Sequence, residues 1–330
     1  FAHIARASAP GARAATYSVA GAVRRGLAEA GFAVTRAPGF AHKRERLVAE
    51  FAGAPSETSP RELPETAVVI GGGIAGACTA AALLQRDVRV TIIDAAGLAS
   101  GGSGNPIGVV SPRLDSGDDP AARFLRAAYL YAADFYRART PASFDACGLI
   151  RAEKDAQKAE KISADPPLPE AWLEIANPAD AGLEAPAAYR LPQAGLLEPA
   201  KAITALTMGC RIVTGRHAAR VEAGAGTWRV LDDDGAAIAE ADIVVIAAGA
   251  GVIEFAGAER LPVQGRRGAL SIAPYTGPDL PAATGGAYAF SRGGALYFGA
   301  TFDPAPLDAP VLPLAPEDHA RNKADLAALS

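Results

Sequence analysis

The sequence predicts an α/β fold divided into a short first segment and a long second one. Half of the 330 residues are apolar and 21% are charged, so the chain has enough apolar material for a sizeable core. Strand-like apolar runs alternate with helical patterns on both sides of a stretch rich in proline and serine. We therefore expect two domains, 1–51 and 65–330, joined by a linker at 52–64.

Residues 1–51 have the pattern of the end of an α/β unit. The expected strands are Ala14–Tyr17, Phe32–Thr35 and Leu47–Phe51, with a helix from Ser18 to Ala30. Ser18 is the expected helix cap, and Gly31 is expected to end the helix. Because so few elements do not make a domain, we expect this segment to be the end of a larger one.

The net charge of −4 conceals a difference between the two segments. Residues 1–51 hold eight Lys and Arg against three Asp and Glu, whereas the rest of the chain is acidic. Side chains that neutralise phosphates are typical of nucleic-acid binding. The candidates here are His42, Lys43, Arg44 and Arg46, with Arg24, Arg25 and Arg36. A solvated basic surface is the equal alternative.

A βαβ unit is expected directly after the linker. The apolar run Thr66–Ile70 is followed by Gly71, Gly73 and Gly76 in G-x-G-x-x-G spacing, a helix at Ala77–Gln85 and a strand at Val88–Asp94. The first glycine permits a tight turn, the second lets a pyrophosphate approach the backbone, and the third lets helix and strand pack closely. The helix N-terminus offers N–H donors to phosphates. The context therefore predicts dinucleotide binding, with an ordinary glycine turn as the alternative.

Three further features support that prediction. Asp94 ends the second strand, where an acid accepts hydrogen bonds from a ribose and disfavours a 2′-phosphate, so FAD or NAD fits better than NADP. A small-residue loop follows that strand, and the buried run Ile243–Ala247 ends in a second small-residue turn. A flexible loop and a plain core strand are their alternatives. The candidate cofactor-binding residues are Gly71, Gly72, Gly73, Ile74, Ala75, Gly76, Asp94, Ser100, Gly101, Ser103, Gly104, Asn105, Gly108, Ala247 and Gly249.

The rest of the second segment is expected to form a substrate-facing layer. Ala121–Arg139 has a helical pattern, whereas 150–200 carries seven prolines and is predicted to be irregular. Further strands are expected at Ala219–Glu222, Thr227–Asp232, Ile243–Ala247, Ala269–Ile272, Gly286–Ser291 and Ala295–Gly299.

Composition also limits the cellular compartment and the kinds of ligand that we expect. The three cysteines show no C-x-x-C spacing, which favours a reducing compartment, and we expect a cytoplasmic protein. The uncharged stretch Ala67–Leu84 is broken by glycines and does not predict a membrane span. The histidines lack the spacing of metal ligands, so no metal is expected. A first residue Phe1 and an unterminated helical pattern at Arg321–Ser330 predict an excised fragment.

These motifs resemble a known superfamily. The runs AVVIGGGIAG and GGALYFGATFD, with Asp94 and the loop ASGGSGNPIGVVSPRL, resemble the FAD-dependent amine-oxidising superfamily of D-amino-acid oxidase and glycine oxidase. That loop, with ATYSVAGAVRRGLAEAGFAV and PGFAHKRERLVAEF, is similar to the family of bifunctional tRNA 5-methylaminomethyl-2-thiouridine biosynthesis proteins. The resemblance implies an FAD-binding Rossmann-like domain with an inserted α+β substrate domain at 65–330. It implies the C-terminal part of a methyltransferase α/β domain at 1–51.

The resemblance also implies a two-step reaction on the wobble uridine of tRNA. An FAD-dependent oxidase removes the carboxymethyl group of 5-carboxymethylaminomethyl(2-thio)uridine, and an S-adenosylmethionine-dependent methyltransferase then methylates the amine. S-adenosylmethionine binding is expected only in the complete parent protein, and the flavin site at 65–330 is expected to be C-terminally incomplete. The strand Arg267–Leu270 departs from the family pattern, because Ala269 stands in place of Gln.

No catalytic side chain is assigned, because hydride loss from an amine to a flavin requires no acid–base pair. Two other functions stay open at this point. One is a free amino-acid oxidase resembling glycine oxidase, for which a basic first segment has no use. The other is a non-catalytic fragment that binds a nucleotide or tRNA.

Overall fold

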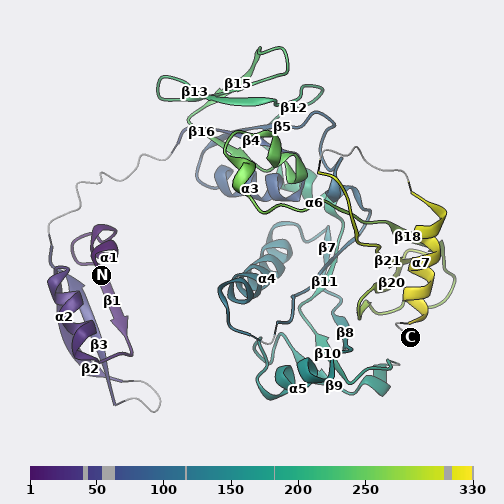
Figure 1. Ribbon diagram of the computed structural model, residues 1–330, viewed down its shortest axis with the longest axis horizontal. Coiled ribbons are helices and arrows are strands. Elements are labelled where there is room, and N and C mark those ends of the chain that lie inside the picture. The colour runs from purple at the N-terminus through teal and green to yellow at the C-terminus, as the bar shows by residue number, and fades with distance from the viewer. Residues whose placement is uncertain (40–43, 54–63, 116, 182, 308–313, 329–330) are drawn as a thin grey trace. The chain divides into compact units, whose positions relative to one another are not determined.

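The computed structural model describes residues 1–39, 44–53, 64–115, 117–181, 183–307 and 314–328. The chain divides into two compact units, Phe1–Leu63 and Pro64–Ser330 (Figure 1). Of the sequence-predicted features, His42, Lys43 and most of the linker 52–64 lie outside the described residues.

The N-terminal unit is a small antiparallel sheet with helices on one face. Its elements are α1 (Ala2–Arg6), β1 (Arg13–Thr16), α2 (Gly21–Glu29), β2 (Phe32–Pro38) and β3 (Glu45–Phe51). The sheet order is β1-β3-β2. Leu27 of α2 packs against Phe32 and Phe51, whose ring centroids lie 5.0 Å apart. The three predicted strands of this segment are therefore confirmed.

The start of α2 corrects one prediction. Ser18 is not the helix cap, because α2 begins at Gly21 with Ala20 at the N-cap position. The backbone N–H of Ser18 instead donates to the Thr16 hydroxyl, 3.2 Å away, which holds the preceding residues in a turn. The chain therefore enters the helix three residues later than the capping pattern predicts.

The centre of the second unit is a four-stranded parallel sheet in the order β12-β5-β4-β16. Its strands are β4 (Thr66–Ile70), β5 (Arg89–Ile93), β12 (Arg211–Val213) and β16 (Ile243–Ile246). The Asp242 carboxylate accepts the Thr66 N–H at 2.8 Å and so joins the starts of β16 and β4. All four strands end at the same edge, which is where ligands bind in such sheets.

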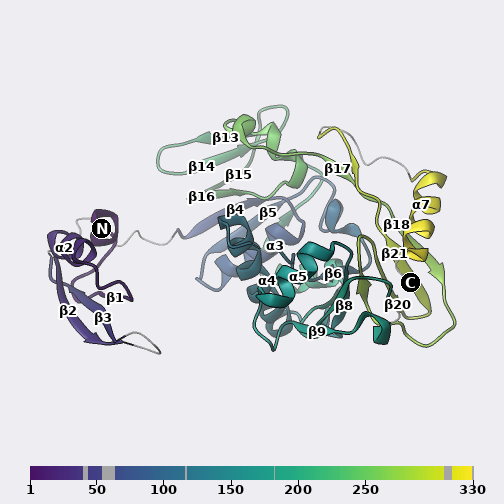
Figure 2. The same cartoon turned by 60° about the horizontal axis from the view of Figure 1, so that its bottom comes forward.

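Alternate residues of β4 pack into two different cores. Ala67 and Val69 face α3 (Ile74–Leu84), whereas Val68 and Ile70 face the antiparallel strands β13 (Arg220–Ala223), β14 (Trp228–Leu231) and β15 (Ala237–Ala241). Figure 2 shows this second sheet beside β16. The predicted βαβ unit is confirmed, although α3 begins at Ile74 and so contains Gly76 in its first turn. The sequence pattern missed β15.

The second layer combines a mixed sheet, a small sheet and helices. The sheets are ordered β18-β21-β20-β19-β8-β10-β9 and β6-β11-β7. Their strands are β6 (Gly108–Val110), β7 (Phe144–Asp145), β8 (Leu149–Glu153), β9 (Glu174–Ala176), β10 (Ala187–Leu191), β11 (Gly195–Leu197), β18 (Leu270–Pro274), β19 (Ala283–Thr284), β20 (Tyr288–Arg292) and β21 (Ala295–Gly299). The helices are α4 (Pro120–Arg139), α5 (Ala156–Ala164), α6 (Pro199–Leu206) and α7 (Pro316–Ala327). The core of this layer includes the fully buried Tyr189 and Phe290.

The prediction that 150–200 is irregular is wrong. The segment contains β8, α5, β9, β10, β11 and the start of α6. Its prolines stand at the boundaries of these elements: Pro199 is the first residue of α6, Pro192 follows β10, and Pro186 precedes it. A proline at a helix start or a strand end costs no ladder hydrogen bond. The prolines therefore lie between regular elements and do not prevent helices and strands from forming.

Short elements complete the second unit. These are the 3₁₀ helices η1 (Gly102–Gly104), η2 (Pro178–Ala181), η3 (Gly249–Glu254) and η4 (Ala258–Arg260), and the paired strands β17 (Arg266–Arg267) and β22 (Asp303–Pro304). Among the described residues, no helix combines the length and apolar character needed to cross a bilayer.

Candidate functional site

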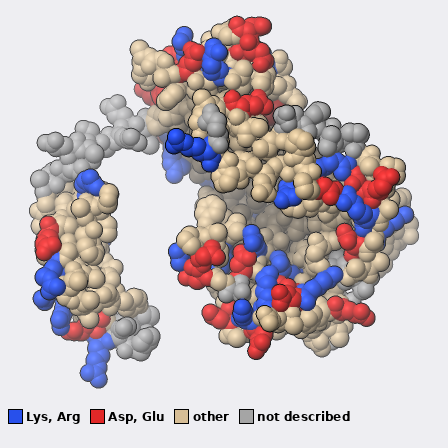
Figure 3. All heavy atoms as spheres, in the orientation of Figure 1, with Lys and Arg blue, Asp and Glu red and all other residues tan. Residues whose placement is uncertain are grey.

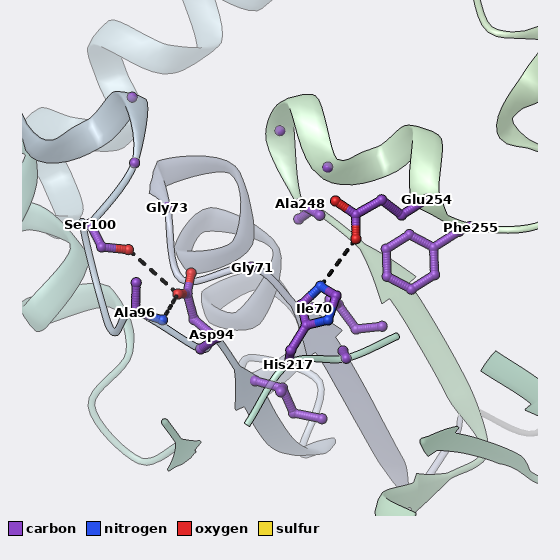
Figure 4. A pocket seen from close by; sticks show the side chains of 18 residues that line it. Ile70, Gly71, Gly73, Asp94, Ala96, Ser100, His217, Ala248, Glu254 and Phe255 are labelled. Atoms are coloured by element: carbon purple, nitrogen blue, oxygen red, sulfur yellow. Dashed lines mark hydrogen bonds and ion pairs between the residues drawn. The ribbon is translucent and has the colours of Figure 1, made fainter. Parts of the chain in front are cut away.

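A pocket opens at the carboxyl ends of β4, β5 and β16 (Figure 4). Its volume is about 310 Å³, at the lower end of the range for small-molecule sites. The residues that line it are Ile70, Gly71, Gly73, Ile93, Asp94, Ala95, Ala96, Ser100, Gly101, Gly102, His217, Ala218, Ala247, Ala248, Gly249, Gly251, Glu254 and Phe255. Seven of them were predicted from the sequence: Gly71, Gly73, Asp94, Ser100, Gly101, Ala247 and Gly249.

The three motif glycines meet different surroundings. Gly71 has φ +113°, and a Cβ there would stand 2.3 Å from the Ala247 carbonyl oxygen. A Cβ on Gly76 would stand 2.0 Å from the Gly71 carbonyl oxygen, so α3 approaches the turn more closely than any side chain allows. A Cβ on Gly73 would meet only the Ser103 hydroxyl at 3.3 Å. Gly71 and Gly76 are therefore required by backbone packing, whereas Gly73 faces the pocket.

The Asp94 carboxylate organises the wall beside the glycine turn. One oxygen, Oδ2, accepts the Gly72 N–H at 2.7 Å. The other, Oδ1, accepts the N–H groups of Ala96 and Gly97 at 3.1 Å and the Ser100 hydroxyl at 3.4 Å. These bonds fix the carboxylate at the pocket surface, between the glycine turn and the loop that follows β5.

That loop contributes unevenly to the pocket. Ser100 and Gly101 line it, whereas Ser103 is not a lining residue and its Oγ accepts the Ile74 N–H at 3.0 Å. Gly104 and Asn105 are exposed and Gly108 lies in β6, so none of the three lines this pocket. Gly72, Ile74, Ala75 and Gly76 belong to the turn and the first turn of α3 without lining the pocket.

The opposite wall includes residues that sequence reasoning missed. His217 and Ala218 come from the connection between β12 and β13, and Glu254 and Phe255 come from the end of η3. His217 Nε2 lies 3.0 Å from Glu254 Oε2, and His217 Nδ1 lies 3.1 Å from Asp233 Oδ1. Figure 4 shows the imidazole pointing toward Glu254. No motif marks these positions, because only the fold brings them together.

The electrostatics of this wall depend on His217. Among the residues that line the pocket in the described part of the chain, it is the one basic side chain, beside the acids Asp94 and Glu254. Its hydrogen bond with Asp233, and the charges of Asp233 and Glu254, raise the pKa of His217 above its ordinary value. Within the described ranges no cluster of three or more His, Cys, Asp or Glu is arranged to hold a metal ion.

A glycine turn between a parallel strand and a helix, with a carboxylate at the end of the next strand, defines the class of dinucleotide-binding α/β proteins. Comparison with known families specifies the class further. The profile of the family described as FAD dependent oxidoreductase matches residues 66–329. The chain therefore belongs to the FAD dependent oxidoreductase family. A second profile, for S-adenosyl-L-methionine-dependent methyltransferases, matches residues 1–52.

Curated relatives align with both parts of the chain. The chain is 40% identical over 326 residues to the tRNA 5-methylaminomethyl-2-thiouridine biosynthesis bifunctional protein of Caulobacter vibrioides, covering 97% of this chain and 53% of that protein. It is 34% identical over 351 residues to the protein of the same name from Chromohalobacter salexigens, covering 98% and 49%. The chain thus spans about half the length of these curated relatives.

Solved structures confirm the fold class. Glycine oxidase from Geobacillus kaustophilus is similar with a TM-score of 0.62 and 20% identity, covering 81% of this chain and 78% of that one. A mutant of Amadoriase I from Aspergillus fumigatus is similar with a TM-score of 0.62 and 19% identity, covering 81% and 73%. At such identities the likeness concerns the fold alone.

Proposed function

We propose that residues 65–330 form the FAD-dependent oxidase part of a bifunctional enzyme that modifies the wobble uridine of tRNA. Residues 1–51 would then be the end of its methyltransferase part, and 52–64 the linker. The observation that carries this proposal is the order of the two family matches, methyltransferase at 1–52 and oxidoreductase at 66–329. Relatives named as bifunctional tRNA-modifying proteins align across both parts.

We expect the pocket to take the pyrophosphate and adenosine part of FAD. The space at Gly73 admits a phosphate against the backbone, which a longer side chain would fill. Asp94 would accept hydrogen bonds from the ribose, and no Lys or Arg among the described residues lines the pocket to neutralise an additional 2′-phosphate. Ser100, Gly101, Ala247 and Gly249 complete the walls of the proposed site. The FAD would be held without a covalent bond, because neither Cys nor His occurs in the glycine turn or the loop after β5.

When bound, FAD supplies the hydride acceptor for oxidation of the N–CH₂ bond of the substrate amine. The chain's own residues at the sheet edge, in the glycine turn and the loop after β5, would hold the dinucleotide. Water would then hydrolyse the oxidised C=N bond, so that the carboxymethyl group leaves as glyoxylate and a primary amine remains on the uridine. Methylation of that amine requires S-adenosylmethionine and belongs to the complete parent protein.

The partner proposed for the N-terminal unit is tRNA. In Figure 3 blue side chains lie along the α2 edge and at the β2–β3 end of its visible face, with red side chains between them. Arg24, Arg25, Arg44 and Arg46 are exposed, whereas Arg36 is paired with Glu45 at 3.0 Å. We place the protein in the cytoplasm because its proposed substrate is tRNA.

Nucleoside mass spectrometry tests this function. tRNA carrying 5-carboxymethylaminomethyluridine is incubated with this chain and, separately, with the full product of its gene, with glycine and sarcosine as competing substrates. We expect the full product to release glyoxylate and to form the methylated nucleoside. If it leaves the tRNA unchanged but oxidises glycine rapidly, the protein is an amino-acid oxidase instead.

A further inference from the structure

The connection between β12 and β13 crosses from the parallel sheet to the second, antiparallel sheet beside the pocket. It is anchored to that sheet by Arg216, whose guanidinium pairs with Asp232 and donates to the Ala237 carbonyl at 3.3 Å. The next residue, His217, contacts Asp233 in the β14–β15 turn with one ring nitrogen. Its other ring nitrogen contacts Glu254 at the end of η3. One imidazole therefore links two elements that are far apart in sequence.

The link lies beside the apolar part of the pocket wall. Ala218 follows His217 and Phe255 follows Glu254, and both side chains line the pocket. Both are 5% exposed and belong to the same core cluster. A change in the distance between the connection and η3 therefore moves two groups that a bound nucleotide would contact.

We propose that His217 is a positioning residue for the bound dinucleotide, because its link between Asp233 and Glu254 fixes the pocket wall formed by Ala218 and Phe255. The inference rests on the proposed function for its choice of FAD as the ligand. The link is strongest when the imidazole is protonated, since each ring nitrogen then donates to a carboxylate. The side chains are about half exposed, so the effect is modest: 47% of the His217 side chain and 49% of the Glu254 side chain are accessible.

The sign of the pH dependence follows from the two carboxylates. Asp233 and Glu254 are the charged groups that act on His217, and both favour its protonated form. The link is therefore complete below the ordinary pKa of histidine, about 6.5, and is lost as the pH rises through the raised pKa of His217. FAD is expected to bind more weakly at high pH, by about two- to fivefold, the range for one partly exposed charge pair.

The experiment is titration of FAD into the flavin-free protein between pH 6 and pH 9, followed by quenching of flavin fluorescence. His217→Ala should weaken binding about two- to fivefold at pH 6 and remove most of the pH dependence. His217→Lys, which keeps a positive charge, should restore wild-type affinity at pH 6 and retain it at pH 9. Glu254→Gln should reduce the pH dependence, and His3→Ala in the N-terminal unit should change nothing.

We expect each variant to fold, because Arg216 still anchors the connection in all of them. Unfolding curves of the same flavin-free variants test this. A His217→Ala protein that is folded and keeps the wild-type affinity and pH profile overturns the inference and leaves the proposed function intact. A wild-type protein that takes up no FAD at any pH overturns both.

Discussion

Gly76 shows most plainly how one residue determines the geometry of the site. Gly76→Ala places a methyl group 2.0 Å from the Gly71 carbonyl oxygen, so α3 or the turn has to move. We expect the strain to lower the free energy of unfolding by about 1–3 kcal/mol. The gain in helix propensity from Gly to Ala, about 1 kcal/mol, offsets part of this loss. Urea denaturation measures the change.

Gly102→Ala is the matched control for that substitution. A Cβ at Gly102 has no heavy atom within 4 Å, so we expect the free energy of unfolding to change by less than about 0.5 kcal/mol. Equal stability of the Gly76→Ala and wild-type proteins would contradict the close approach of helix and turn.

Substitutions at Gly73 are expected to lower FAD affinity without unfolding the protein. Gly73 adopts an extended φ of −80°, and an added Cβ meets one side-chain atom, the Ser103 hydroxyl at 3.3 Å, which has to shift by a few tenths of an ångström, so Gly73→Val is expected to fold. The branched side chain occupies the space proposed for phosphate, and we expect FAD affinity to fall about tenfold or more. Gly73→Ala should lose less, since its methyl group only touches Ser103. Fluorescence titration measures the FAD affinity of both variants. An unchanged affinity in Gly73→Val would show that the phosphate does not bind against Gly73.

At the scale of elements, a buried carboxylate joins α7 to the short strand β17. Arg267 pairs with Asp318, which is 4% exposed, and Asp318 also accepts the Ala315 N–H at 2.9 Å. The hydrogen bond from Arg267 is the largest of the effects that hold the pKa of Asp318 far below its usual range. The ionised form is therefore the one that docks the helix.

The lowered pKa of Asp318 determines how the stability of the protein changes with pH. Because the folded-state pKa lies below the unfolded value of about 3.9, the stabilisation is present above that pH and is lost as the pH falls through the folded-state pKa. We expect Asp318→Asn to be less stable than wild type at pH 6, with the difference narrowing toward pH 3. Thermal unfolding at both pH values measures it. Asp325→Asn, an exposed position on the same helix, should match wild type at pH 6; equal losses in both variants would contradict the role of Asp318.

The elements differ in how well the sequence predicted them. β4 was predicted from Thr66 to Ile70 without error, because a continuous apolar run bounded by glycine indicates a buried parallel strand. The segment 150–200 was predicted wrongly, because proline spacing alone does not reveal whether a proline stands inside or between elements. β15 reads Ala-Ile-Ala-Glu-Ala, which has low β-propensity, and its pairing with β14 makes it a strand.

At the scale of the whole molecule, some pocket residues were also predictable from the sequence and others were not. The glycine turn, Asp94 and Ser100 were predictable because they lie close together in one βαβ unit. His217 and Glu254 were not, because 37 residues separate them and they meet only after β12, β16 and η3 have assembled. Local motifs identify one wall of the pocket, and tertiary structure provides the other.

The tRNA proposal predicts a change in salt dependence for the whole protein. Arg44→Gln with Arg46→Gln should weaken tRNA binding, and each lost phosphate contact should lower the slope of log K against log salt by about 0.9 for a duplex or 0.7 for a single strand. Filter binding at several salt concentrations measures this slope. Arg123→Gln with Arg126→Gln, two arginines that pair with Asp118, is the charge-matched control. An unchanged slope in the Arg44→Gln, Arg46→Gln variant would show that these two arginines are solvated and do not contact tRNA phosphates.

The central claim is that the second unit holds FAD without a covalent bond. The most direct measurement is the absorbance spectrum of the purified protein, before and after denaturation and filtration, with the flavin in the filtrate identified by mass spectrometry. We predict a yellow protein that releases intact FAD, up to one per chain. A colourless protein that takes up no added FAD, or a flavin that stays with the denatured chain, would contradict the account.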